Sequence, residues 1–528
     1  MGRSLAPLLL LLVTLALPLV LRPAQPEPLA AQETLVILTP HNEVIRFEFE
    51  RAFAAHMRAK GRQVRIDWRT PGGTSEMSRY LASEYLAAFE RHWTHELGRP
   101  WNTVAARAFS DPRAGEGDAA RRAFLRSSVG CGIDLLFGGG SIEFSKHADA
   151  GLLVDSGLLG QHPELFGSQG IPQIAGGERY WDAQGRWVGT CLSGYGICFN
   201  RDVLRRIGIR AAPTSWSALA DPAYFGQLAL TDPTKSGAGV KTFEMLIQQQ
   251  MAEAVAAVPA RRHDEPDAER EAVAEGWARS MRLIRRIGAN ARYFSDAHAK
   301  IALDITQGDA AAGMCIDFYS RFQSETLDPH TRARRMDFVL PEHGTSFGAD
   351  PIGLLRGAPH RELAIEFMRF TLGDAGQKLW AFRRGTPGGP QRYSLRRLPI
   401  SPRLYRPEHR AHRADPDANP YEGRGFVYRA EWTGSLFSTI AFVVRVMCID
   451  SGDELRAAFR ELARAGFPRA ATALFDDISL FDYRTVSGPI RGALRASDPL
   501  AQARLSNRLI AAQREQYRRV ATLARAGR

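Results

Sequence analysis

The segment "TLVILTPHNEVIRFEFERAFAAHMRAKGRQVRIDWRT" spans residues 34–70 and decides the fold. The apolar run Leu35–Leu38 predicts a short buried strand, and "QVRIDWR" predicts a second strand. Between them an amphipathic helix is expected to end at Gly61, because apolar residues repeat at helical spacing at Ile45, Phe49, Phe53 and Met57. A strand, a helix and a strand with short connections form a parallel βαβ unit, so the sequence predicts an α/β protein.

The N-terminus, residues 1–31, is typical of a secretory signal peptide. An early Arg3 precedes an apolar run from Leu8 to Leu21, and "LAAQE" supplies small residues for cleavage. The run is shorter than the roughly 20 residues that a spanning helix needs, although an uncleaved anchor remains an alternative. No later segment is expected to span a membrane. The predicted location is the periplasm.

Composition excludes several classes of protein. Five cysteines in 528 residues are too few for a disulfide scaffold, and their spacing does not suggest structural zinc. From residue 391 onward the sequence has 24 arginines, no lysine and 14 acidic residues, which leaves +10 of the total net charge of +12. No nucleic-acid module is recognisable. This basic region is expected to meet an acidic partner or, peripherally, the anionic headgroups of a membrane.

Small polar residues follow the predicted strands. The strand ends read "TPHN", "GGTS", "GGGS", "LSGY", "TDPTKSG" and "DFYS". In open α/β sheets, ligands gather at the carboxyl ends of strands. None of these ends is a cluster of catalytic residue types. The pattern therefore predicts a site that binds a polar ligand through backbone N–H groups, hydroxyls and helix N-termini.

Seven ordered motifs carry a family resemblance over roughly residues 34–390. They are "LVILTPHNEVIRFEFERAF", "PGGTS", "IDLLFGGGS", "RWVGTCLSGYGICFNRDVL", "SWSALADPAYFGQLALTDPTKSG", "GDAAAGMCIDFY" and "ELAIEFMRFTLGDAGQKLW". In this order they resemble bacterial extracellular solute-binding proteins. The nearest group is the iron(III)/thiamine/phosphate-ester branch of the type II periplasmic binding proteins that serve ABC importers.

The resemblance implies a two-lobed α/β fold with the solute in the cleft between the lobes. "CLSGYGIC" and "GMCIDFY" would be the strands that cross between them. The expected boundaries are a first lobe in residues 32–192, a second lobe in residues 193–318, a return to the first lobe in residues 319–394, and a basic, mostly helical C-terminal extension in residues 395–528. The expected partners are a small-molecule solute and an ABC transporter permease. No cofactor, bound metal or catalytic residue is expected.

The candidate solute-binding residues lie at the strand ends. They are His41, Asn42, Gly73, Thr74, Ser75, Gly140, Ser141, Ser193, Thr234, Lys235, Ser236, Asp317 and Tyr319. Each has a structural alternative. Hydroxyls before a helix are also common N-caps, a lysine is usually a solvated surface residue, and Asp317 is placed equally well for an ion pair that holds the hinge. If the solute is anionic, Lys235 would complement its charge.

Two other functions remain as alternatives. One is a ferric-ion binder of the same fold. The resemblance implies that ferric binders use an adjacent pair of tyrosines late in the chain as ligands, but the corresponding segment here, "AGQKLWAFRRG", has Trp380 and Phe382 instead. A periplasmic serine hydrolase is the other, because "GTSFG" fits G-x-S-x-G around Ser346. A nucleophile elbow requires a helix directly after the serine, and the sequence predicts a strand there.

Overall fold

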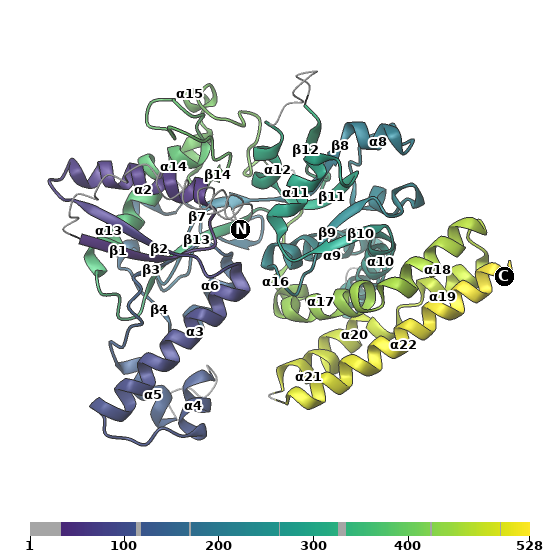
Figure 1. Ribbon diagram of the computed structural model, residues 1–528, viewed down its shortest axis with the longest axis horizontal. Coiled ribbons are helices and arrows are strands. Elements are labelled where there is room, and N and C mark those ends of the chain that lie inside the picture. The colour runs from purple at the N-terminus through teal and green to yellow at the C-terminus, as the bar shows by residue number, and fades with distance from the viewer. Residues whose placement is uncertain are drawn as a thin grey trace, which may run out of the picture.

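The computed structural model describes residues 33–111, 118–167, 170–262, 265–325, 334–422, 425–496 and 498–527. The predicted signal peptide, residues 1–31, lies outside the described residues. Two separate sheets with helices against them form two lobes, and a set of helices follows at the C-terminal end (Figure 1). The structure confirms the predicted α/β architecture and the mostly helical C-terminal region.

The first lobe is built on a seven-stranded mixed sheet. β1 pairs in parallel with β2 and with β3, whereas β13 runs antiparallel to β3 and β7. The strands, in sheet order with β4 paired to β13 at the side, are β14 (Leu398–Pro399), β7 (Val188–Ser193), β13 (Gly348–Leu355), β3 (Leu135–Phe137), β1 (Glu33–Leu38), β2 (Val64–Arg69) and β4 (Leu153–Val154).

Helices of the first lobe connect and cover these strands. The predicted stripe of Ile45, Phe49, Phe53 and Met57 is buried against the sheet, which fixes the first helix. The helices are α2 (Glu43–Arg58), α3 (Thr74–Arg91), α4 (Thr103–Ser110), α5 (Ala119–Arg126), α6 (Ser141–Asp149), α7 (Leu158–Gln161), α13 (Arg361–Leu372), α14 (Asp374–Ala381) and α15 (Pro407–Arg410). A separate hairpin pairs β5 (Ile174–Ala175) with β6 (Glu178–Arg179).

The second lobe is built on a five-stranded mixed sheet. In sheet order its strands are β10 (Ala291–Ser295), β9 (Leu228–Thr231), β11 (Ala312–Ile316), β8 (Tyr195–Asn200) and β12 (Met336–Val339). Its helices are α8 (Arg201–Arg206), α9 (Gly237–Ala256), α10 (Ala268–Ala289), α11 (His298–Gln307) and α12 (Asp317–Gln323). β9 pairs in parallel with β10 and β11, so the carboxyl ends of these three strands share one edge.

The chain crosses between the two sheets at Gly194, from β7 to β8, and again over residues 340–347, from β12 to β13. "CLSGYGIC" therefore contains the first crossover. The expectation that "GMCIDFY" is the second crossover strand is wrong, because β11 lies inside the second sheet, hydrogen-bonded to β8 and β9. The predicted return to the first lobe at residue 319 is accordingly too early. Likewise β14 pairs with β7, so the chain just after residue 395 still belongs to the first sheet.

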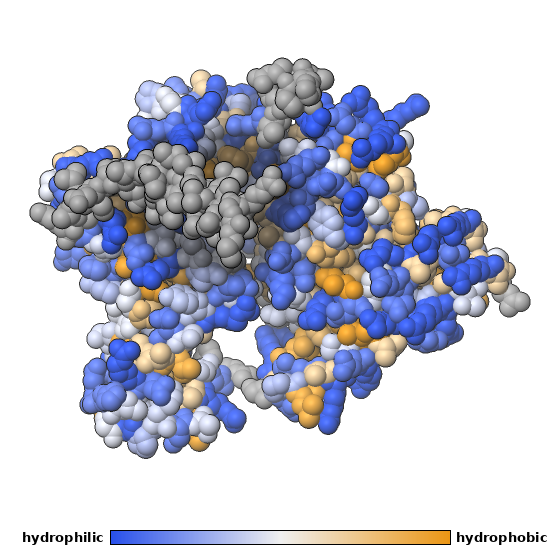
Figure 2. Space-filling view, viewed as in Figure 1, coloured by the Kyte–Doolittle hydropathy of each residue, from blue (hydrophilic) through white to orange (hydrophobic). Residues whose placement is uncertain are grey.

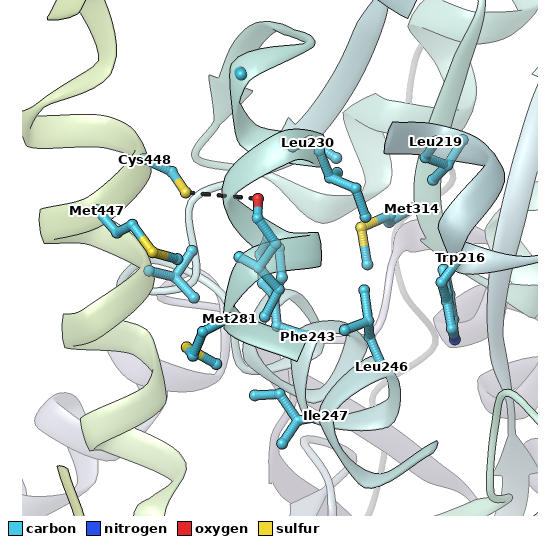
Figure 3. Packing of buried hydrophobic residues seen from close by; sticks show 14 of the residues in the cluster. Trp216, Leu219, Leu230, Phe243, Leu246, Ile247, Met281, Met314, Met447 and Cys448 are labelled. Carbon is cyan, nitrogen blue, oxygen red and sulfur yellow. Dashed lines mark hydrogen bonds between the residues drawn. The ribbon is translucent and has the colours of Figure 1, made fainter. Parts of the chain in front are cut away.

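The C-terminal helices, residues 430–525, pack on the second lobe. They are α16 (Ala430–Thr433), α17 (Phe437–Val444), α18 (Gly452–Arg464), α19 (Arg469–Asp476), α20 (Tyr483–Thr485), α21 (Arg491–Arg495) and α22 (Pro499–Arg525). Their apolar side chains share one hydrophobic core with α9 and α10 (Figure 3). Figure 2 shows a mainly hydrophilic surface over both lobes and these helices, with small hydrophobic areas between.

One stretch among the described residues, Ala430–Asp450, is long and apolar enough to cross a membrane by length and composition. The sequence-based expectation that no such segment follows the N-terminus is therefore wrong on those criteria. Most of the stretch, 61% of its most apolar window, is buried inside the protein. That burial accounts for its apolar sequence as part of the core of the second lobe.

Candidate functional site

A cavity of about 630 Å³ lies between the two lobes, and both sheets contribute to its wall. From the first sheet come residues that follow β1, β2 and β3, and from the second sheet come residues that follow β9, β10 and β11. All six are carboxyl ends of parallel strands, the position at which α/β sheets bind ligands. A cavity of this volume suits a small organic molecule.

Two helices of the first lobe begin at this cavity. α3 starts at Thr74 after Gly73, and α6 starts at Ser141 after Gly140, with no side chain capping either N-terminus through the usual hydrogen bond. The first N–H groups of a helix have no partner within the helix, and the helix dipole places partial positive charge there. These two N-termini are therefore prepared to bind an anion or another acceptor.

The three-glycine turn before α6 has a structural reason. Gly138, Gly139 and Gly140 all have positive φ, at 87°, 122° and 84°. Residues with a side chain rarely adopt this backbone conformation. The turn aims two backbone N–H groups at one carboxylate: Gly139 and Gly140 donate to Oδ1 of Asp350 at 2.6 and 3.3 Å. An acidic side chain of the protein itself thus occupies part of this anion-binding turn.

Arg397 holds that carboxylate in place. Its Nη1 lies 2.8 Å from Oδ2 of Asp350, its Nη2 donates to Oγ of Ser193 at 2.9 Å, and its guanidinium stacks 4.0 Å from the ring centroid of Phe318. The side chain is only 1% exposed. Burial raises the pKa of Asp350, but Arg397, His41 and the N–H of Gly139 together outweigh that effect, so the pKa lies below its usual value. Arg397 therefore joins the first lobe to Phe318 of the second.

Two helices of the second lobe also begin at the cavity. α9 follows Ser236, whose Oγ accepts a hydrogen bond from the N–H of Gly239 at 3.3 Å. α11 begins at His298 after Ala297 and has no capping side chain. The His298 ring is occupied elsewhere: Nδ1 lies 2.8 Å from Oγ1 of Thr231, and Nε2 accepts from the N–H of Ile316 at 2.9 Å. His298 therefore acts as a structural bridge between strand ends.

Lys241 lies one turn into α9 and faces the cavity from a buried network. Its Nζ is 2.9 Å from Oε1 of Glu178, 3.0 Å from Oε2 of Glu244 and 3.9 Å from the ring centroid of Tyr428. Burial opposes the charge, but the two carboxylates raise the pKa of Lys241 well above its usual value. Ser346 donates to the same Glu178 at 2.6 Å, so the crossover between β12 and β13 is tied to this lysine.

The cavity lining contains nine of the thirteen predicted residues. These are His41, Gly73, Thr74, Gly140, Ser141, Ser193, Lys235, Ser236 and Tyr319. Lys235 is exposed where it lines the cavity. Contact of these nine residues with the solute stays a prediction.

Four predicted residues do not line the cavity. Asn42 caps α2 by accepting from the N–H of Ile45, and Thr234 donates to Asp232 within its own turn. Asp317 is buried beneath the cavity, where burial raises its pKa to about 6. Ser75 and Thr234 instead line a smaller groove that shares part of its wall with the cavity.

His41 is 6% exposed and packs against Phe137 and Trp380. Burial lowers its pKa to about 4, against the attraction of Asp350. In the unfolded chain the pKa of this histidine is near 6.5, so between pH 6.5 and pH 4 the unfolded chain binds a proton that the folded protein does not. The free energy of unfolding therefore falls as the pH is lowered through this range. We expect the wild type to lose about 3 kcal/mol through His41 over this range.

His41→Gln lacks this titration, so its free energy of unfolding should fall less between pH 7 and pH 4.5. Urea unfolding of both proteins at several pH values measures the difference, in which the shared titration of other groups cancels. Parallel pH dependences would contradict the assignment.

Sequence reasoning missed several residues of the cavity. Asp296 and His298 follow β10 in "FSDAHAK", a strand end of the same kind as those predicted. Lys241 is one of only six lysines in the chain, but it lies within a helix whose neighbouring residues are buried. Asp350 and Arg397 have no local signal, because they meet only through the tertiary fold.

The hydrolase alternative has no support at Ser346. The residue is buried, its hydroxyl is bound to Glu178, and it lies against the sulfur of Met245. All five cysteines are free thiols. Among the described residues there is no group of three or more histidine, cysteine, aspartate or glutamate side chains arranged to hold a metal ion.

Comparison with known proteins gives a family for part of the chain. Residues 145–401 match the profile of a family described as bacterial extracellular solute-binding proteins. An uncharacterized protein of Haemophilus influenzae is 22% identical over 256 residues, 48% of this chain and 61% of that protein. The phosphoglycerate transport regulatory protein PgtC of Salmonella typhimurium is 22% identical over 196 residues, 37% of this chain and 40% of that protein.

The chain spans about half the length of the curated relatives that it matches. Among solved structures, iron-bound HitA of Pseudomonas aeruginosa has 15% sequence identity and a TM-score of 0.46, covering 78% of this chain and 99% of HitA.

Proposed function

We propose that this chain, whose residues 145–401 match the family of bacterial extracellular solute-binding proteins, captures a small organic anion between its two lobes. The chain would deliver this solute to the permease of an ABC importer. The observation that carries the anionic character is the convergence of four helix N-termini, those of α3, α6, α9 and α11, on one cavity.

The charged side chains of the lining do not by themselves decide whether the solute is an anion or a cation. Besides His41 and His298, the described lining holds three lysine or arginine residues and four acidic ones: Lys235, Lys241, Arg397, Glu76, Glu143, Asp296 and Asp350. Most of them already have partners of opposite charge, as Glu76 has Arg79 and Glu143 has Lys146. Each helix N-terminus adds roughly half a positive charge, and its first N–H groups have no partner within the helix, although Ser236 accepts one of those of α9. These fixed donors tip the balance toward an anion, even though Asp350 uses part of the α6 turn.

The same geometry supports capture by closure. α3 and α6 belong to the first lobe and α9 and α11 to the second, so one solute would receive hydrogen bonds from both. A ligand that bridges two lobes favours the closed arrangement by its differential affinity for that state. The permease would recognise the closed state. Export to the periplasm, and a peripheral contact of the basic C-terminal region with anionic membrane lipids, complete the proposal.

A thermal-shift panel tests the proposal, since a ligand that binds the folded protein raises its melting temperature, and a tighter ligand at the same concentration raises it more. The panel contains 3-phosphoglycerate, glucose 6-phosphate, inorganic phosphate, thiamine, a polyamine and ferric citrate. Phosphoglycerate is included because the relative PgtC is named for its transport. We expect a shift with an organic phosphate and none with the polyamine. A shift with the polyamine alone would indicate a cationic solute. A shift with ferric citrate alone would favour the ferric alternative.

Lys235→Ala should weaken binding of an organic phosphate about 3- to 10-fold, because an exposed ammonium contributes a screened charge-assisted contact. The loss should shrink as salt is added. Titration calorimetry at low and physiological ionic strength measures it. Lys300→Ala is the control, since Lys300 is an exposed lysine of the same lobe that pairs with Asp304 and does not line the cavity. Equal affinity of wild type and Lys235→Ala at every salt concentration would make Lys235 a solvated bystander.

A further inference from the structure

The solute cavity has one wall residue from the C-terminal helices. Phe437, the first residue of α17, lines the cavity together with the strand ends of both lobes. It lies 36 positions beyond residue 401, where the match to the solute-binding family ends. The family resemblance therefore does not account for its presence there.

The ring of Phe437 meets the first lobe at the mouth of the cavity. Nζ of Lys146, on α6, lies 5.8 Å from the ring centroid, within the range of a cation–π contact. Figure 1 places α17 beside the second lobe and α6 at the facing side of the first. Phe437 thus reaches from one lobe to the other.

A groove of about 260 Å³ adjoins the cavity. The cavity and the groove share four lining residues: Thr74, Glu143, Gly237 and Phe437. The groove also contains Ser75, Thr234, Lys146 and Arg445. Phe437 consequently stands at the boundary between the cavity and this groove, whose wall includes the exposed Arg445.

α17 holds Phe437 firmly against the second lobe. Ile440, Val443 and Val444 of the same helix are fully buried in the core. In the turn before it, Thr433 donates to Oε1 of Glu244 at 2.6 Å and receives a hydrogen bond from Nε2 of Gln248 at 2.7 Å. Phe437 is itself only half-buried, so its position depends on its helix rather than on its own packing.

We propose that Phe437 is a specificity-determining residue that packs on the carbon skeleton of the solute and closes the cavity mouth. The C-terminal helices are then part of the binding site. This inference rests on the proposed function and adds the solute class: an organic anion, whose charged group meets the helix N-termini while its carbon atoms reach the aromatic ring. An inorganic anion at the helix N-termini lacks the carbon atoms for that contact, so Phe437 would discriminate against it.

The test compares Phe437→Ala, Phe437→Leu and the wild type by titration calorimetry with 3-phosphoglycerate, glucose 6-phosphate and inorganic phosphate. We expect Phe437→Ala to weaken the organic ester that binds best roughly tenfold, the scale of losing one aromatic contact, and to change inorganic phosphate less than twofold. Phe437→Leu keeps apolar volume and should lose less, and it serves as the informative variant if the alanine variant folds poorly.

Phe442 provides the matched control. It lies on the same helix, is also half-buried, and lines the groove without lining the cavity. Phe442→Ala should bind all three probes as the wild type does. An equal loss in both alanine variants, or wild-type affinity in Phe437→Ala and Phe437→Leu, would overturn the inference and leave the proposed function standing. If the wild type binds none of the three phosphates, the proposed function fails and this inference fails with it.

Discussion

Arg397→Ala is expected to abolish solute binding and to lower the free energy of unfolding by about 3–5 kcal/mol, the usual result of removing one partner of a buried ion pair. The guanidinium is 1% exposed and binds Asp350 and Ser193, both at the cavity wall. Without it, the carboxylate of Asp350 stays buried with two backbone N–H groups as its remaining donors. The contact with Phe318 across the lobes is lost as well.

Chemical denaturation and calorimetry measure the two effects. Arg384→Ala is the control, since Arg384 is an exposed arginine of the same region and should change stability by less than about 0.5 kcal/mol. The double variant Arg397→Met, Asp350→Asn removes both charges, and it should recover much of the lost stability but not the binding. A double variant no more stable than Arg397→Ala would show that the loss comes from packing rather than from an unpaired charge.

The strand ends could be predicted because their position follows from local pattern. A buried apolar run followed by glycine and hydroxyl residues marks the carboxyl end of a strand, and parallel pairing brings such ends to one edge. Thr74, Ser141 and Ser236 reach the cavity for this reason. The sequence did not reveal which way a polar side chain turns there, and Asn42 and Thr234 satisfy their own turn or helix instead.

Contacts between residues far apart in the sequence could not be predicted from local sequence pattern. Asp350 and Arg397 lie 47 positions apart, and they meet because β14 pairs with β7 beside β13. The second crossover was misplaced for a related reason. A short strand followed by a helix has the same sequence pattern whether it lies within one sheet or crosses between two. Only the hydrogen bonds of β11 to β8 and β9 show that it lies within the second sheet.

A chain that ends at residue 425 is expected to lose its cooperative folding. The C-terminal helices complete the core of the second lobe, where Met447 and Cys448 face Phe243 and Met281 (Figure 3). Trp277 of α10 also donates to the carbonyl of Phe481 at 2.8 Å. Truncation would expose several large side chains of α9 and α10, each worth roughly 1.5–3 kcal/mol. Their sum is on the order of 10 kcal/mol, comparable to the whole stability of a typical protein.

Size-exclusion chromatography and circular dichroism on the truncated chain test this expectation, with aggregation or a broad thermal transition as the predicted result. Arg504→Ala and Arg508→Ala are suitable controls, because both side chains are exposed on α22 and should change stability by less than about 0.5 kcal/mol. A monomeric truncated chain that melts as sharply as the full-length protein would show that the C-terminal helices are a dispensable appendage. The expected collapse would instead make them part of the second lobe, which is the condition for Phe437 to keep its place at the cavity.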